Sequence, residues 1–89
     1  MKNSIATVLA AYGFQPRANG SMYWGRGSLV WGDSFRVAPI AANLYEVRVR
    51  HWFYDPDGEP VQDVAETRVL RGAEALAWVF AEAPRAFWR

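Results

Sequence analysis

A chain of 89 residues with a formal net charge of +1 has the size of one domain and is too short for two. Hydrophobic residues make up 52% of it and aromatic residues 16%, which excludes a disordered linker. Its ten basic and nine acidic residues argue against a dedicated polyanion binder, and the absence of cysteine excludes disulfides and thiolate metal sites. We therefore expect a single folded domain spanning residues 1–89.

The charges are unevenly distributed along the chain. Residues 1–42 hold four basic residues and one acidic residue, whereas residues 43–89 hold six and eight. Such a split can orient a domain on a partner. The segment before Gly13 is too short and too polar for a signal peptide, and no apolar run approaches the length of a membrane span. These features favour a protein of the bacterial or phage-host cytoplasm that has no membrane partner.

The first predicted element is a short helix over residues 5–12. Its apolar stripe recurs at helical spacing and consists of Ile5, Val8, Leu9 and Tyr12. Asn3 or Ser4 can cap its start. Gly13 is placed to end it in a left-handed conformation, after which Phe14 would pack back against Leu9.

Short β-type runs follow at residues 22–24, 29–31 and 35–37. An Asn19-Gly20 turn precedes them, and glycine-containing turns over residues 25–28 and 32–34 are predicted between them. We expect this stretch to form a hairpin or a bent, bulged strand.

The clearest strand is predicted over residues 44–54, because its residues alternate between two kinds of face. One face carries Tyr45, Val47, Val49, His51 and Phe53, and the other carries Glu46, Arg48, Arg50, Trp52 and Tyr54. Asp55-Pro56-Asp57-Gly58 then predicts a tight turn with Gly58 in a left-handed conformation.

Residues 61–70 have an ambiguous period that would also suit a helix. We favour a returning strand, because it would bring Asp63 and Glu66 close to Arg48 and Arg50, and opposite charges across strands are favourable.

A second helix is predicted over residues 72–83, ending at Pro84, with an aromatic tail over residues 85–89. The fold class is therefore α+β: an antiparallel sheet of three to four strands flanked by an N-terminal and a C-terminal helix, in the order α-β-β-β-α. The residues expected in the core are Leu9, Tyr12, Phe14, Val47, Val49, Phe53, Leu76, Val79 and Phe80.

Few residues support catalysis or metal binding. His51 is the only histidine and has no nucleophile in a recognisable motif beside it. The acids between Asp55 and Glu66 resemble the spacing of a calcium loop, but Pro60 stands where that loop needs glycine. We therefore expect no catalytic residue, metal site or cofactor, and a protein that is not an enzyme.

Arg48, Arg50, Trp52 and Tyr54 form the candidate partner-binding set, because they share one strand face. Arginine and aromatic residues are enriched in protein interface hot spots. The same types bind single-stranded nucleic acid by phosphate contact and base stacking. A charged outer face paired with Asp63 and Glu66 would explain the same residues without a partner, and the three alternatives stay open from the sequence.

In size and build the chain resembles the small phage-encoded inhibitors of host machinery, anti-CRISPR proteins among them. The resemblance lies in the α-β-β-β-α order over residues 3–83, the missing catalytic set and the Trp/Arg-rich surface. It implies a non-enzymatic protein-binding domain that occludes a surface of a CRISPR effector complex. The alternative is a small single-stranded nucleic-acid-binding module that uses the Arg48–Tyr54 strand face.

Overall fold

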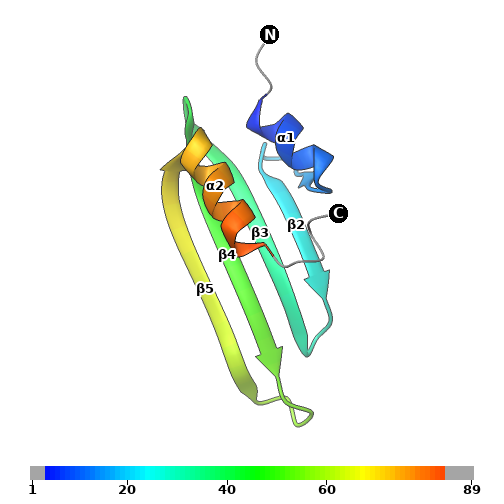
Figure 1. Cartoon of the computed structure of the whole chain (residues 1–89). Coiled ribbons are helices and arrows are strands. Elements are labelled where there is room, and N and C mark those ends of the chain that lie inside the picture. Colours follow the sequence, from blue (N-terminus) through cyan, green and yellow to red (C-terminus); the bar gives the residue numbers. More distant parts are fainter. Residues whose placement is uncertain (1–3, 84–89) are drawn as a thin grey trace.

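The computed structural model describes residues 4–83, which form one antiparallel sheet and two helices (Figure 1). In chain order the elements are α1 (Ile5–Ala11), β1 (Gln15–Pro16), β2 (Met22–Gly27), β3 (Trp31–Ala41), β4 (Leu44–Tyr54), β5 (Pro60–Arg71) and α2 (Gly72–Glu82). The strands lie in the sheet in the order β1-β2-β3-β4-β5, each antiparallel to the next. The α+β class is confirmed, but the sheet has five strands rather than three to four.

Helix α1 begins and ends where local signals place it. The Ser4 hydroxyl accepts a hydrogen bond from the Thr7 amide. At the other end, the Gly13 amide donates to the Ala10 carbonyl and the Phe14 amide donates to the Leu9 carbonyl, with Gly13 at φ +94°. This pair of bonds is a Schellman motif and confirms the predicted helix end. Neither helix in the described part of the chain is long and apolar enough to cross a membrane.

The turn between β2 and β3 lies at residues 28–30, and the turns predicted over residues 25–28 and 32–34 are both wrong, because β2 continues to Gly27. Gly32 and Asp33 belong to β3, where Gly32 lies opposite Trp52 of β4. A Cβ atom on Gly32 would collide with the Trp52 ring. The glycine therefore marks a close approach of a side chain to the sheet and does not mark a turn.

The β4–β5 hairpin follows the prediction. Gly58 has φ +85°, and its amide donates to the Asp55 carbonyl at 3.0 Å. The Asp55 carboxylate also accepts the amides of Asp57 and Glu59. Residues 61–70 form a strand, which resolves the ambiguity in favour of the returning strand.

Both helices pack on the same face of the sheet (Figure 1). The Tyr12 ring, directly after α1, contacts the Phe80 ring of α2, and the two ring centroids are 5.0 Å apart. The buried core lies beneath them and consists of Leu9, Phe14, Met22, Phe35, Val37, Val47, Val49, Ala75, Trp78 and Val79. The aromatic tail expected over residues 85–89 lies outside the described residues.

Four residues predicted in the core are only partly covered. Phe53 is 50% and Tyr12 38% exposed, and Leu76 and Phe80 are half-buried at the edge of the core. Phe53 is exposed because α2 is much shorter than β4. An 11-residue helix spans about 16 Å, whereas an 11-residue strand spans about 36 Å. Helix α2 therefore leaves the far end of β4 uncovered.

Candidate functional site

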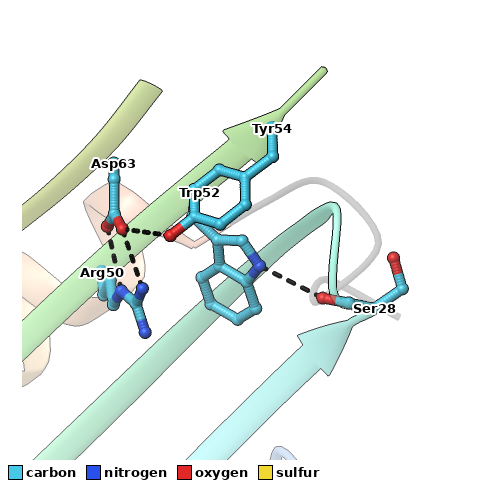
Figure 2. A network of polar contacts seen from close by, with 5 residues as sticks. All are labelled: Ser28, Arg50, Trp52, Tyr54 and Asp63. Carbon is cyan, nitrogen blue, oxygen red and sulfur yellow. Dashed lines mark hydrogen bonds and ion pairs between the residues drawn. The ribbon is translucent and has the colours of Figure 1, made fainter. Parts of the chain in front are cut away.

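The sheet face opposite the helices, here called the open face, carries the candidate residues. Arg48, Arg50, Trp52 and Tyr54 alternate along β4 and lie on this face, with the last three drawn in Figure 2. The register adds neighbours from the other strands, namely Tyr23 from β2, Ser34 and Arg36 from β3 and Asp63 from β5. Tyr23 and Arg36 could not be placed beside Arg48 from the sequence, because their position depends on the register of β2 and β3.

Arg50, Tyr54 and Asp63 form a closed polar network (Figure 2). The Arg50 Nε and Nη2 atoms donate to the two Asp63 carboxylate oxygens at 3.0 and 2.9 Å, and the Tyr54 hydroxyl donates to Oδ2 at 2.8 Å. The Arg50 hydrogen bonds, followed by the Tyr54 hydrogen bond, lower the pKa of Asp63 to about 2. The bond to Asp63 likewise raises the pKa of Tyr54. Arg50 is thus already neutralised by a carboxylate of its own chain.

The Trp52 indole is fixed by contacts on several sides. Its ring touches the Gly32 backbone, and its Nε1 donates to the Ser28 carbonyl at 3.2 Å (Figure 2). The Arg50 guanidinium lies over the ring, 4.8 Å from its centroid. The ring therefore holds one orientation before any partner arrives.

A second group of the same composition lies at Tyr23. A Cβ atom on Gly25 would come within 2.6 Å of the Tyr23 hydroxyl and 3.0 Å of its ring, and the Arg17 guanidinium lies 4.4 Å from the ring centroid. Each aromatic residue thus lies against a strand glycine and beneath an arginine. From the sequence both glycines were assigned to turns, whereas in the structure Gly25 lies inside β2 and Gly32 inside β3, where a strand glycine marks close approach.

Arg48 differs from the other arginines of the open face. It lies directly opposite Arg36 and two positions from Arg50, and like charges directly opposite each other destabilise a sheet. Arg36 is partly compensated by Glu46 at 3.5 Å. Arg48 is exposed and has no salt bridge or side-chain hydrogen bond among the described residues; its charge acts on Asp63 only from a distance, as the last of the causes that lower the pKa of that carboxyl.

The three arginines surround a shallow hollow. The hollow has a volume of about 240 Å³ and is lined by Tyr23, Ser34, Arg36, Arg48 and Arg50. A carboxylate of a partner placed there would meet the Arg48 fork, which can donate two parallel hydrogen bonds. The geometry thus suits the binding of an anionic group.

Of the two acids expected beside the arginines, only Asp63 lies there. The position predicted for Glu66 is wrong: it lies opposite Val49, on the helix side of β5, and pairs with Arg68 at 2.6 Å. The two acids are three residues apart, and strand side chains alternate between faces. They therefore cannot share a face.

His51 lies on the helix side, in a cluster that joins several elements. Its Nδ1 lies 2.5 Å from Asp33 Oδ1, its Nε2 lies 3.9 Å from Glu82, and Asp33 also accepts a hydrogen bond from Arg26. No hydroxyl group of the described residues is hydrogen-bonded to the ring. Within residues 4–83 no three His, Asp or Glu side chains are grouped to hold a metal ion. The contacts tie β2, β3, β4 and α2 together.

No family model, curated protein or solved structure matches the chain. The functional proposal therefore rests on the geometry of the open face.

The Asp63 network predicts a pH dependence of stability. Because folding lowers the pKa of Asp63 from 3.8 to about 2, its stabilising effect is complete above about pH 5 and is lost as the pH falls towards 2. Urea unfolding should show Asp63→Asn less stable than the wild type at pH 5, with the difference closing near pH 2. In an Arg50→Gln background the difference at pH 5 should shrink, and an unchanged difference there would contradict the role of Arg50.

Proposed function

We propose that this chain is a non-enzymatic domain that binds an acidic surface of a partner protein through its open face. The observation that carries the proposal is the exposed, unpaired Arg48 directly opposite Arg36 on that face. A cation set beside another cation costs folding energy, and a carboxylate from a partner would remove that cost. Arg48 would be the central contact.

The locked aromatic residues support the same proposal. Trp52 and Tyr23 are large, rigid and already ordered by glycine and arginine neighbours. Ordering a side chain on binding costs about 0.5–1.5 kcal/mol, so rings fixed in advance bind at lower cost. Aromatic and arginine residues are also the residue types that dominate interface energetics.

The same contacts favour a protein over a single-stranded nucleic acid. Base stacking needs free ring faces, whereas Trp52 and Tyr23 are each already in contact with a glycine and an arginine.

A narrower proposal is that the domain is an inhibitor of phage type, acting in the host cytoplasm, and that its partner is a CRISPR effector complex. Its support is the small size, the α+β build with a helix at each end of the strands, and a rigid face suited to occlusion. The inhibitor would act stoichiometrically, by covering the surface that the effector needs.

The proposal is tested by affinity capture of partners from bacterial lysate, with and without nuclease treatment. Two variants each remove one positive charge: Arg48→Gln from the open face, and Arg26→Gln from the helix side, where Arg26 pairs with Asp33, so circular dichroism is used to show that both variants are folded. We expect a protein partner that survives nuclease, is lost with Arg48→Gln and is retained with Arg26→Gln. Equal recovery with both variants would contradict the proposal.

Experiments with purified components test the CRISPR-inhibitor proposal and the nucleic-acid alternative separately. Addition of the domain to purified CRISPR effector complexes should block target binding at equimolar ratio, and lack of effect on every complex type would remove the narrower proposal alone. Tight binding to a single-stranded oligonucleotide that weakens steeply with salt and disappears in Arg48→Gln would replace the protein partner by nucleic acid.

A further inference from the structure

Strand β5 forms an open edge of the sheet. It runs for 12 residues, from Pro60 to Arg71, and pairs with β4 on one side only. No strand among residues 4–83 pairs with its outer side (Figure 1). All of its residues except Leu70 are exposed. Unpaired backbone groups along such an edge are a template for pairing with another strand.

The sequence of this edge is symmetric in character about Thr67. Reading outwards from Thr67, one side carries an acid, two apolar residues and an acid, in the order Glu66, Ala65, Val64 and Asp63. The other side carries a base, two apolar residues and a base, in the order Arg68, Val69, Leu70 and Arg71. A segment of this kind is complementary to a second copy of itself that runs in the opposite direction.

We propose that β5 pairs antiparallel with β5 of a second copy of the chain, with Thr67 opposite Thr67 on a two-fold axis. In this register Asp63, which also accepts from Arg50 and Tyr54, faces Arg71, and Glu66, which also pairs with Arg68 of its own chain, faces Arg68 of the second copy; each pair occurs twice. Val64 faces Leu70 and Ala65 faces Val69. Opposite charges and apolar pairs directly across strands are both favourable, so every position from 63 to 71 meets a compatible partner.

Neighbouring registers lack this match. A two-fold axis across a continuous sheet requires facing residues to lie on the same face, so the centre must fall on a residue. Centring on Glu66 would place two glutamates directly opposite each other, and centring on Arg68 would place two arginines opposite each other. Like charges there are unfavourable. Centring on Ala65 would place Glu66 opposite Val64, and centring on Val69 would place Arg68 opposite Leu70, so both would leave the charges without an opposite partner, and Thr67 gives the best match.

The structure leaves room for this pairing. The irregularity of the β4–β5 ladder, where Tyr54 pairs with Pro60 but Phe53 with Gln62, lies outside residues 63–71. Val64 and Val69, which are 51% and 54% exposed, would each gain an apolar neighbour. The two open faces would lie on the same side of the joined sheet, and the two α2 helices, each starting at Gly72, would lie on the other side near opposite ends of the paired segment.

Cysteine cross-linking tests the register, because the chain has no cysteine of its own. Facing residues have Cα atoms about 4.5–5.5 Å apart, within the reach of a disulfide, so Thr67→Cys should form a covalent dimer under mild oxidation. The control is Val69→Cys on the same strand face. Its two copies would lie more than ~13 Å apart along the strand and should stay uncoupled. Equal cross-linking of the two variants would overturn the register.

Charge reversal tests the pairing without a covalent bond. Glu66→Arg alone would face arginine with arginine, and Arg68→Glu alone would face glutamate with glutamate, so both should sediment as monomers. An equimolar mixture should form heterodimers, because the arginine introduced in one copy then faces the glutamate introduced in the other. Circular dichroism would show whether each variant is folded. A wild-type chain that stays monomeric over a wide concentration range, or folded variants that dimerise as the wild type does, would overturn the proposal.

Discussion

Replacing Phe35 with alanine should lower the free energy of unfolding by about 3–5 kcal/mol. Phe35 is fully buried at the centre of β3, with the Trp24 ring 5.6 Å away and the His51 ring 6.1 Å away. Its truncation leaves a cavity that neighbouring strands cannot close without breaking their register. A domain of 89 residues has a total stability of roughly 4 to 13 kcal/mol, so the variant should lie at the edge of folding.

Phe53→Ala is the matched comparison for Phe35→Ala. Phe53 is half exposed, so its loss should cost only about 1 kcal/mol, from the apolar area that it still buries. Urea unfolding of the two variants measures the difference directly. Equal costs would mean that Phe53 is covered as completely as Phe35, in conflict with the length of α2.

Features governed by neighbouring residues could be predicted from the sequence. The Schellman end of α1, the faces of β4 and the Asp55–Gly58 turn each depend on a few consecutive residues. The alternation in β4 placed Arg48, Arg50, Trp52 and Tyr54 together on one face, as the structure has them. A short-range signal is sufficient for such features.

Features governed by the register between strands could not be predicted. That Arg36 lies opposite Arg48, and that Trp52 lies over Gly32, depends on where the β3–β4 turn sets the pairing. The exposure of Phe53 depends on how far α2 extends along the sheet, and the alternation of residues within β4 carries no information about that distance. The central feature of the candidate site, an unpaired arginine facing another arginine, is therefore a property of the folded sheet.

The Arg36–Arg48 pair leads to a prediction in which stability and binding change in opposite directions. Arg48→Glu places a carboxylate directly opposite Arg36 and between Glu46 and Arg50, each two positions away on the same face. A favourable cross-strand pair in place of an unfavourable one is worth roughly 0.2–1 kcal/mol. The variant should therefore melt at a temperature equal to or a few degrees above that of the wild type, as measured by calorimetry.

Partner binding by the same variant should weaken by at least about 30-fold, because central interface arginines commonly contribute about 2 kcal/mol or more and the reversed charge would repel an acidic partner surface. Arg48→Lys is the matched control: it keeps the charge but loses the two-pronged guanidinium, so it should lose part of the affinity and gain no thermal stability. Titration calorimetry with the captured partner measures the affinity of both variants, and scanning calorimetry measures their melting temperatures. A variant Arg48→Glu that melts higher and still binds at wild-type affinity would place the interface elsewhere than on the open face. One that melts lower would mean that Arg48 stabilises the folded sheet.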